Sequence, residues 1–400
     1  MTITGIIAEY NPFHLGHAYQ IAETKRRIGP DSAIVCVMSG DYVQRGEPAI
    51  FSKFARARAA LSCGADLVIE LPLPWSMASA EYFAGGAVAI LNGLGVVDYL
   101  SFGSESADLD GMYKIVQAEK STDFSQKIKS AMEEGISYPA ARTAVLEELT
   151  GGKAEALRRP NDTLGIEYLK ALDRQHSTIQ PLVIRRVGAG HDQYSAEIIK
   201  SASELRAMLA HGENIGNHVP QNAYTVFMQE IRQGRGPVTG KAMEGLVLSR
   251  LRMMDLENFQ RMPDAAEGLE RKLYKACQTE PDLESIIWKV KSKRYTYARI
   301  RRMCMFAALG IDRQMLTQMP NYGRILACNL RGTEILRCAR KTASIEMVNR
   351  PSSVRKLDHQ INSIFACNAK AHDLYVLGYQ NNEYHRGGED WTTSPWVTYE

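Results

Sequence analysis

One stretch near the N-terminus decides the fold of this 400-residue chain: residues 3–17 read ITGIIAEYNPFHLGH. Residues 3–8 are an apolar run rich in β-branched side chains, which predicts a buried parallel strand. Asn11-Pro12 predicts a turn, and residues 14–28 predict a helix. A strand that runs through a short turn into a helix predicts an anion site, because unpaired N–H groups and the helix dipole face the ligand there.

The same alternation continues along the first half of the chain. Further strands are predicted over residues 33–38, 67–71, 99–102 and 181–187, and helices over residues 53–63, 78–91 and 201–210. This order predicts an α/β fold with a Rossmann-like, mostly parallel sheet. Ligands of such sheets bind at the carboxyl ends of the strands, which directs attention to the loops 9–17, 39–48, 72–77 and 103–106.

The second half has a different pattern. We expect no strand after about residue 215, and helices over residues 222–232, 239–259, 265–278, 282–309, 331–347 and 362–370. The predicted domains are therefore a catalytic domain over residues 1–215 and a mainly α-helical domain over residues 216–400. Residues 1–200 carry 20 Lys and Arg against 24 Asp and Glu, whereas residues 201–400 carry 28 against 21. A basic helical half is typical of a domain that binds a polyanion.

The sharpest basic cluster contains no acidic residue and lies within the predicted helix 282–309. Its members are Lys289, Lys291, Lys293, Arg294, Arg299, Arg301 and Arg302. Helical spacing would bring five of these and neighbouring side chains onto one face: Lys291, Arg294, Tyr295, Arg299 and Arg302. A cationic face with one aromatic ring suits phosphates and an unstacked base. The alternative is a solvated face that only keeps the protein soluble.

Composition narrows the class of protein. Hydrophobic residues make up 45% and charged residues 23%, as in soluble globular proteins. No uncharged apolar run of about 18 residues is present, so we expect no membrane span, and we also expect no secretory signal. The seven cysteines include no CxxC pair, which argues against a zinc site or disulfide framework and favours reduced thiols in the cytoplasm.

His14 and His17 are the strongest candidates for chemistry. They are three residues apart at the predicted helix start, so their imidazoles share one face, and Gly16 leaves room for a phosphate. Two imidazoles at a helix N-terminus can stabilise the charge that develops on phosphorus during a displacement. The alternative is a pair of polar histidines with a capping role. The sequence has no GxxxxGK[ST], GxGxxG or GxSxG motif in the required context.

Other polar residues follow strands or open helices. Ser203 is predicted to cap the helix over residues 201–210, and Arg206 one turn later would reach the same anion. Gly103 closes one predicted strand, where a nucleobase or ribose could approach, and Arg186 ends another, where it could meet a phosphate. In the loop 39–48 and just beyond it, three residues are candidates for holding an acid substrate or a phosphate: Gln44, Arg45 and Lys53.

A set of motifs makes the chain resemble one family of the HxGH nucleotidyltransferase superfamily. The motifs are GIIAEYNPFHLGH, MSGDYVQRGEPAIFSK, GADLVIELP, SFGSE, RPNDTLGIEYLKAL, RRVGAGHD and SASELR, with KRYTYARIRRM and NYGRILACN further on. Together they are similar to the bacterial tRNA(Met) cytidine acetate ligases. The resemblance implies that acetate attacks the α-phosphorus of ATP to give acetyl-adenylate and pyrophosphate. The acetyl group then passes to the exocyclic amine of the wobble cytidine of elongator methionine tRNA, releasing AMP.

The residues themselves make His14, His17 and Lys53 the catalytic candidates, and the resemblance implies the ATP site. With Ser203 and Arg206 added from the helix start, the ATP site would comprise Ile7, Ala8, Glu9, Tyr10, Asn11, Pro12, Phe13, His14, Leu15, Gly16, His17, Ala18, Tyr19, Gln20, Gly103, Asn161, Arg186, Val187, Ser203 and Arg206. Mg²⁺ is expected as the counter-ion of ATP, because the motif does not neutralise a whole triphosphate. No metal site of the protein's own is predicted.

Two other classes of function remain open from the residues alone. One is a small-molecule adenylyl- or cytidylyltransferase of cofactor metabolism, which would need no basic helical half. The other is a non-enzymatic RNA-binding scaffold that retains a nucleotide-binding fold.

Overall fold

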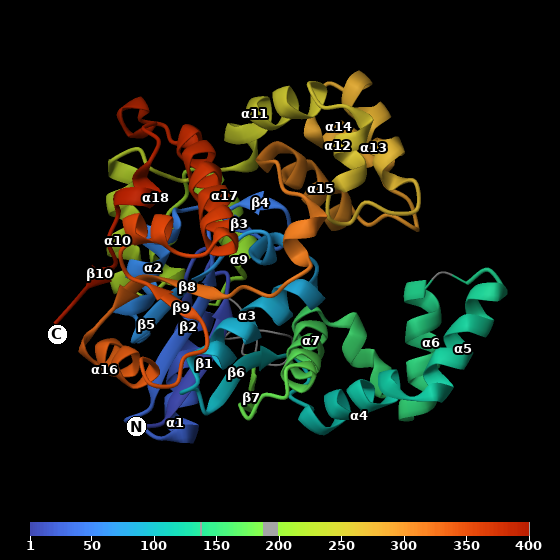
Figure 1. Cartoon of the computed structure of the whole chain (residues 1–400), viewed down its shortest axis with the longest axis horizontal. Coiled ribbons are helices and arrows are strands. Elements are labelled where there is room, and N and C mark those ends of the chain that lie inside the picture. Colours follow the sequence, from blue (N-terminus) through green and yellow to red (C-terminus); the bar gives the residue numbers. More distant parts are fainter. Residues whose placement is uncertain (137, 187–198, 400) are drawn as a thin grey trace.

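The computed structural model describes residues 1–136, 138–186 and 199–399, and it has a mostly parallel sheet at its centre (Figure 1). The strands are β1 (Ile3–Ala8), β2 (Ala33–Ser39), β3 (Tyr42–Val43), β4 (Glu47–Pro48), β5 (Leu67–Leu71), β6 (Tyr99–Ser104), β7 (Gln180–Arg185), β8 (Tyr322–Cys328), β9 (Glu346–Val348) and β10 (Trp396–Val397). The order across the sheet is β10-β8-β5-β2-β1-β6-β7, and β9 pairs with β8. The predicted α/β fold class is confirmed.

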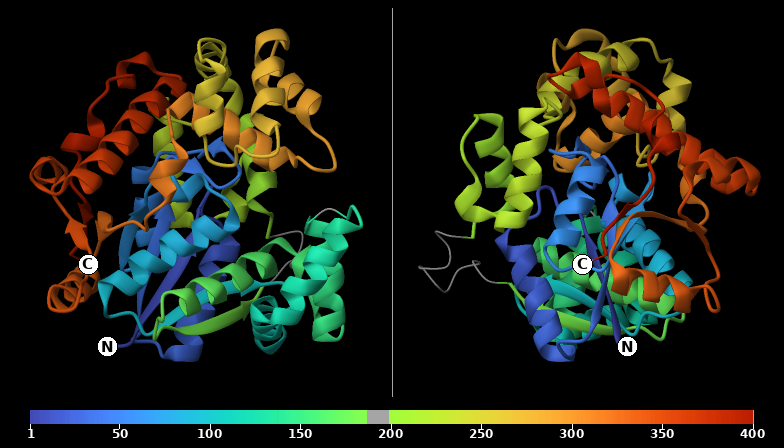
Figure 2. Two further views of the ribbon diagram at one scale, coloured as in Figure 1. Left: turned by 45° about the vertical axis from the view of Figure 1, so that its right-hand side comes forward. Right: turned by 90° about the vertical axis from the view of Figure 1, so that its left-hand side faces the viewer.

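Helices cover both faces of the sheet, and further helices project beyond it in two directions (Figure 2). In the first half they are α1 (Leu15–Ile28), α2 (Lys53–Ser62), α3 (Ala80–Leu94), α4 (Leu109–Lys120), α5 (Thr122–Glu133), α6 (Tyr138–Thr150), α7 (Pro160–Arg174) and α9 (Ala202–Ala210). In the second half they are α10 (Gln221–Arg232), α11 (Gly240–Arg252), α12 (Leu256–Arg261), α13 (Leu269–Thr279), α14 (Leu283–Val290), α15 (Tyr297–Leu309), α16 (Leu330–Ala339), α17 (His359–Tyr375) and α18 (Glu389–Thr392). None of the helices in the described ranges combines the length and the apolar character that crossing a membrane requires.

The two faces of β1 show how the layers form. Ile3 and Ile7 belong to one apolar core with α3 and α7, whereas Ile6 belongs to a second core with α1, α2, α9 and α10. This alternation is what the period of two in a strand dictates. Gly5 allows α3 to approach closely, since a Cβ atom there would lie 2.7 Å from Leu91 Cδ1. The apolar run read from the sequence is therefore a central strand buried on both sides.

The expectation of no strand after residue 215 is wrong. β8 lies antiparallel beside β5, and β9 and β10 each pair with β8 in parallel. All seven residues of β8 are buried. The chain after residue 216 is mainly helical, but it returns to complete the sheet beside β5. The division into domains at residues 215 and 216 stays a prediction.

Three predicted helices are also wrong in extent. The segment 282–309 forms α14 and α15 with a break at residues 291–296, and 239–259 divides into α11 and the start of α12. The segment 331–347 holds only α16 and the start of β9. Tertiary contacts decide these breaks, because helix propensity alone is too weak to set them.

Buried charges join the returning segment to the sheet. Six buried charged side chains, each from a different part of the fold, lie together. They are Asp41 from the loop after β2, Lys53 from the start of α2, Glu70 from β5, Arg324 from β8, His372 from α17 and Asp390 from α18. Lys53 Nζ lies 2.7 Å from Asp390 Oδ2 and 2.9 Å from Glu70 Oε1. Arg324 Nη1 lies 2.9 Å from Asp390 Oδ2. We call these six residues the buried ionic cluster. A buried charge requires such partners, so each member holds the others in place.

His372 joins α17 to the loop after β2. Its Nδ1 lies 2.8 Å from Asp41 Oδ2, and its Nε2 lies 3.0 Å from Glu389 Oε2. Burial alone would lower the pKa of His372, but the carboxylates of Asp41 and Asp390 outweigh burial and raise this pKa to about 10. The imidazole is therefore a cation at neutral pH, which each carboxylate favours.

We expect His372→Gln to lower the unfolding free energy by about 3–5 kcal/mol at pH 6, because it leaves buried carboxylates without their cation. The loss should shrink between pH 6.5 and about 10, since the folded-state pKa lies above the ordinary value and the stabilisation fades over that range. Urea unfolding at pH 6 and pH 9 measures both values. His211→Gln, at an exposed histidine, is the control. An equal loss for His372→Gln at the two pH values would contradict the assignment of a charged imidazole.

Candidate active site

A cavity of about 380 Å³ opens at the carboxyl ends of β1, β6 and β7, where α1, α7 and α9 begin. This is the place that the parallel sheet predicts for a ligand. Its volume suits a nucleotide-sized molecule. The residues that line it are Ile7, Ala8, Glu9, His14, His17, Gln20, Gln44, Arg45, Ala80, Phe83, Phe102, Gly103, Pro160, Asn161, Leu164, Tyr168, Arg186, Ser201, Ala202, Ser203 and Arg206.

His14 and His17 close the first turn of α1 around each other. Nδ1 of His14 accepts a hydrogen bond from the Gly16 N–H at 3.0 Å, and Nδ1 of His17 accepts one from the His14 N–H at 3.2 Å. The two rings stack with their centroids 3.8 Å apart. The arrangement is a reciprocal cap in which imidazoles replace the usual hydroxyl and carboxylate. Both side chains are therefore fixed by the backbone of the helix that they begin.

The same hydrogen bonds define which ring nitrogen of each histidine carries the proton. A neutral imidazole whose Nδ1 accepts carries its proton on Nε2, so each ring keeps one N–H donor. Burial, with a smaller effect from Arg186, lowers the pKa of His14 to about 4. Burial, then His14 and then Arg186, hold the pKa of His17 well below its ordinary value. At neutral pH the pair consists of two uncharged donors at the cavity wall.

Gly16 serves the histidine pair rather than the ligand directly. A Cβ atom at this position would lie 2.8 Å from His14 Cε1 and 3.0 Å from His14 Nδ1. The expectation that Gly16 makes room for a phosphate is thereby changed: the glycine makes room for the imidazole that caps the helix. Any larger residue would displace His14 from its hydrogen bond with the backbone.

Arg186, directly after β7, and Arg206, in α9, bring positive charge to the cavity from two different elements. Arg206 donates to the Asn11 carbonyl at 2.9 Å and to Ser203 Oγ at 3.3 Å, so α9 is tied to the turn before α1. Arg186 donates to Asn161 Oδ1 at 3.3 Å beside the start of α7. The cap of α9 is Ser201, and the prediction that Ser203 caps this helix is wrong. Ser203 lies in the first turn with its hydroxyl beside Arg206.

Apolar side chains form another part of the wall, and most of them were not predicted from sequence. Phe83 comes from α3, Phe102 from β6, and Leu164 and Tyr168 from α7. Beside them Gly103 leaves the backbone of β6 bare. An aromatic and aliphatic wall next to bare backbone suits the flat face of a base. The motif RPNDTLGIEYLKAL spans most of α7, but the apolar periodicity of α3 and α7 is that of any core helix and did not mark Phe83, Leu164 or Tyr168 as cavity residues.

The predicted ATP residues divide into two groups. Eleven line the cavity: Ile7, Ala8, Glu9, His14, His17, Gln20, Gly103, Asn161, Arg186, Ser203 and Arg206. Eight do not line it: Tyr10, Asn11, Pro12, Phe13, Leu15, Gly16, Ala18 and Tyr19. In that second group Tyr10 and Phe13 are buried, and their rings pack against His17 at 4.8 and 5.5 Å between centroids. Val187 lies outside the described residues.

Lys53 requires a correction. Its side chain is 1% exposed, belongs to the buried ionic cluster and does not line the cavity. The predicted catalytic role therefore does not agree with its position. The other two candidates from that region, Gln44 and Arg45, do reach the cavity. Gln44 also donates its backbone N–H to Glu9 Oε1 at 3.0 Å, and burial raises the pKa of that carboxyl.

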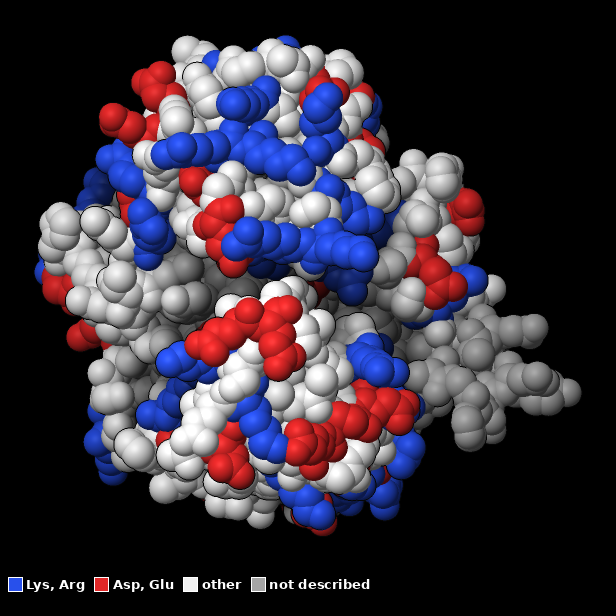
Figure 3. Space-filling view, turned by 90° about the vertical axis from the view of Figure 1, so that its right-hand side faces the viewer, with Lys and Arg blue, Asp and Glu red and all other residues white. Residues whose placement is uncertain are grey.

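The predicted cationic helix face requires a second correction. Lys291 and Arg294 lie in the break between α14 and α15, so the five residues do not share one helix. Tyr295 is 8% exposed and donates to the Glu267 carbonyl. Acidic residues of the loop before α13 pair with the arginines: Glu267 with Arg294 and Arg299, and Asp264 with Arg302. Lysines and arginines nevertheless gather over the lobe formed by α11–α15, at the top of Figure 3.

Comparison with known proteins agrees with this geometry. Residues 1–390 match the model of the HIGH Nucleotidyl Transferase family. Proteins named tRNA(Met) cytidine acetate ligase are 38% identical in Acetivibrio thermocellus and 35% identical in Thermosipho africanus. Those alignments cover 98% of this chain and 99% and 98% of the relatives. The chain belongs to this family of HIGH nucleotidyl transferases.

A solved structure shares both the sequence and the fold. The crystal structure of Thermotoga maritima TmcAL bound with alpha-thio ATP matches with a TM-score of 0.93 and 31% sequence identity. The match covers 100% of both chains. An apo form of the same protein matches equally well. A nucleotide is thus bound by a protein of the same fold over its full length.

We expect His17→Ala to reduce the release of pyrophosphate from ATP by roughly 10²–10³-fold, as for the loss of one preorganised donor. His14→Asn should reduce the rate while keeping the helix cap, because asparagine also accepts from the first-turn N–H groups. Pyrophosphate release with saturating ATP and acetate measures both effects, and circular dichroism verifies the fold. The exposed His211→Ala is the control. Release by His17→Ala at the wild-type rate would exclude a chemical role for this imidazole.

Proposed function

We propose that the protein is an ATP-dependent ligase of the cytoplasm that acetylates the wobble cytidine of elongator methionine tRNA. The observation that carries this proposal is the pair of neutral, backbone-fixed imidazoles at the start of α1, directly after β1. Such a pair suits displacement at a phosphorus atom. The names of the relatives supply the acceptor, since they act as tRNA(Met) cytidine acetate ligases.

The first step joins acetate to AMP. A carboxylate oxygen of acetate attacks the α-phosphorus of ATP, the bond to the bridging oxygen breaks, and pyrophosphate leaves with its electron pair. Negative charge grows on the α-phosphate oxygens, where the Nε2–H donors of His14 and His17 can stabilise it without a change in protonation. Arg186 and Arg206 add positive charge for the rest of the triphosphate.

The second step transfers the acetyl group. The exocyclic amine of cytidine attacks the acetyl carbonyl of the adenylate, AMP leaves, and the amine loses one proton. The cavity must therefore admit the edge of a nucleobase beside the α-phosphate. Gln44 and Arg45 from the β3–β4 turn line one side of it. A mobile RNA nucleotide can enter only if it is unpaired and unstacked.

Mg²⁺ is proposed as part of the ATP substrate. Within the described ranges, no group of three or more His, Cys, Asp or Glu residues is arranged to hold a metal ion. The carboxylate that lines the cavity is Glu9, which is already engaged with the Gln44 N–H. The ion would therefore arrive coordinated by phosphate oxygens, as is usual for Mg²⁺. When bound, it would neutralise charge on the leaving pyrophosphate.

RNA binding is assigned to the lobe of α11–α15. Of the five predicted contacts, Lys291 and Arg294 are exposed, and Arg294 is 62% exposed although it pairs with Glu267. Phosphate contacts at both residues remain the proposal. Arg299 and Arg302 hold the acidic loop in place, and Tyr295 supports them from within the core. These three residues act on RNA binding through the shape of the lobe.

Radiolabelled acetate, ATP, Mg²⁺ and elongator methionine tRNA test the proposal in one reaction. We expect label in tRNA, released as acetylated cytidine after nuclease digestion, with one pyrophosphate formed per acetyl group. Excess EDTA should abolish both products. Pyrophosphate formed with an adenylylated or cytidylylated small molecule, and unlabelled tRNA, would instead support the transferase of cofactor metabolism. Binding of tRNA without any pyrophosphate would support the scaffold.

A further inference from the structure

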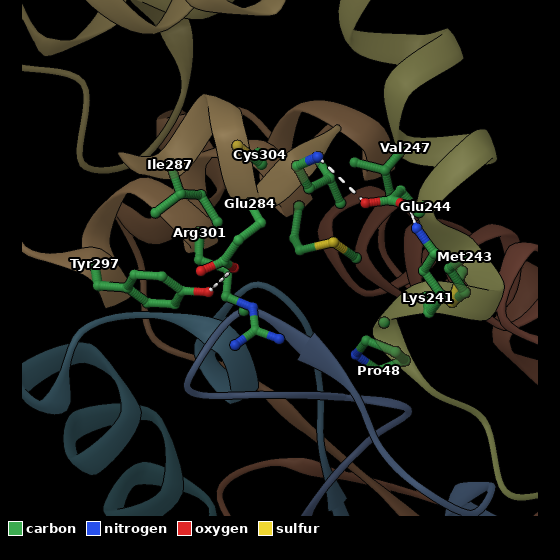
Figure 4. Close-up of a pocket in the computed structure, with 14 residues that line it drawn as sticks. Pro48, Lys241, Met243, Glu244, Val247, Glu284, Ile287, Tyr297, Arg301 and Cys304 are labelled. Carbon is green, nitrogen blue, oxygen red and sulfur yellow. Dashed lines mark hydrogen bonds and ion pairs between the residues drawn. The ribbon is translucent and has the colours of Figure 1, made fainter. Parts of the chain in front are cut away.

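A second cavity, of about 250 Å³, lies between the β3–β4 turn and the helices α11, α14 and α15 (Figure 4). Its floor is apolar and rich in sulfur, whereas its rim carries charged and aromatic groups. The lining residues on which the argument depends are Met243, Glu284, Ile287, Tyr297, Arg301 and Cys304. Polarisable apolar side chains under a polar rim are suited to a planar ring with hydrogen-bonding edges. We call this cavity the lobe pocket.

Glu284 organises the rim of the lobe pocket. Its Oε1 accepts from the Trp288 indole N–H at 2.6 Å, and its Oε2 accepts from the Tyr297 hydroxyl at 2.6 Å. Burial, followed by this bond to Glu284, raises the pKa of Tyr297 to about 12, so the hydroxyl remains a donor. Each carboxylate oxygen keeps a further lone pair. The rim therefore offers a fixed anionic acceptor, held in place from both sides.

Arg301 supplies the complementary donor. Its guanidinium lies 5.8 Å from the centre of the Tyr297 ring and pairs with Glu47 of the β3–β4 turn. In Figure 4 it points into the space between Tyr297 and Pro48. A carboxylate can take an exocyclic amine, and a guanidinium on the same rim can take a ring acceptor, which is a carbonyl oxygen or an unprotonated ring nitrogen. Cytosine, adenine and guanine carry such an amine, and uracil does not.

Trp288 extends the rim onto the surface. The indole is 56% exposed, and the Lys291 ammonium lies 3.9 Å from its ring centre. Its hydrogen bond with Glu284 fixes the ring, so an exposed aromatic face stands beside the lobe pocket. No acidic residue occurs between Glu284 and Asp312, whereas seven lysines and arginines do. An aromatic platform among cations is how proteins hold unpaired nucleic acid.

The lobe pocket shares a wall with the ATP cavity. Gln44 and Arg45 line the ATP cavity, and Gly46 and Pro48 line the lobe pocket. Between them, Glu47 pairs with Arg301 through Oε1, and its Oε2 lies 3.8 Å from Arg206 Nε. A nucleotide held in the lobe pocket is thus one hairpin turn away from the reacting phosphate. That separation suits a neighbour of the reacting nucleotide in the same RNA strand.

We propose that the lobe pocket binds an unpaired nucleobase with an exocyclic amine, next to the reacting cytidine, and that a further base stacks on Trp288. The inference rests on the proposed function, because it requires an RNA substrate. It assigns RNA recognition to Glu284, Trp288 and Arg301, which the cationic helix face did not include, together with Lys291, which it did. Glu284 and Arg301 read the edge of the base, and Trp288 with Lys291 holds the strand.

Trp288→Ala tests the platform, with Trp396→Ala as a matched control. Trp396 is 51% exposed and also lies under a cation, with the Arg58 guanidinium 5.5 Å from its ring centre, but it belongs to β10. We expect Trp288→Ala to bind a methionine tRNA transcript about tenfold more weakly, as for the loss of one stacked base. Trp396→Ala should bind as the wild type does. Pyrophosphate release without tRNA should be unchanged in both variants.

Glu284→Gln tests the pocket itself. Fluorescently labelled hexamers of cytidine and of uridine are the probes, and we expect the wild type to prefer the cytidine hexamer by severalfold. Glu284→Gln should remove that preference, because an amide presents only one acceptor oxygen to the amine. Thermal melting of each variant verifies the fold.

The outcomes separate the two proposals. Equal tRNA affinity of Trp288→Ala and the wild type would overturn the platform, and equal loss in both tryptophan variants would show a general surface effect. No hexamer preference in the wild type would overturn the base pocket. Wild-type protein that binds tRNA with these preferences but never acetylates it would instead overturn the proposed function.

Discussion

The ion pairs of Lys53 Nζ with Asp390 and Glu70 are the interactions on which the rest of the molecule depends. They join the start of α2 and the strand β5 to the short helix α18, which lies more than 300 residues further along the chain, at one buried point. A buried charge that has lost its hydration needs oppositely charged partners. The segment after residue 216 is therefore held against the sheet by ion pairs as well as by apolar packing. Arg324 extends the same network into β8.

That network also sets the position of both cavities. Asp41 accepts from the Lys53 backbone N–H at 2.8 Å, and its carbonyl accepts from the Ala49 N–H at 2.8 Å. These bonds hold the two ends of the β3–β4 hairpin. The hairpin forms one wall of the ATP cavity and one wall of the lobe pocket, so under the proposed function RNA bound to the α11–α15 lobe would lie next to the nucleotide. The two halves of the chain are thus joined where the two steps of the reaction would meet.

The parts of the site that sequence could predict are those set by local rules. Apolar runs predicted β1, β2, β5, β6 and β7, and the turn before α1 predicted that His14 and His17 lie at a helix start. The other features arise from contacts distant in sequence. Lys53 looked like a phosphate ligand because its partner Asp390 lies 337 positions away. The break before α15 follows from Tyr295 reaching the Glu267 carbonyl, although Thr296 is an ordinary helix cap that could have indicated it.

The central claim is that acetate oxygen bonds directly to the α-phosphorus at the start of α1. Acetate labelled with ¹⁸O in both oxygens tests this claim, in a single incubation with ATP and methionine tRNA followed by mass spectrometry of the nucleotide product. Attack at the α-phosphorus predicts AMP that carries one ¹⁸O atom. The acetate oxygen that joins the acetyl carbon to phosphorus stays on phosphorus when the amine takes the acetyl group. Unlabelled AMP, or ¹⁸O found in inorganic phosphate, would contradict the account.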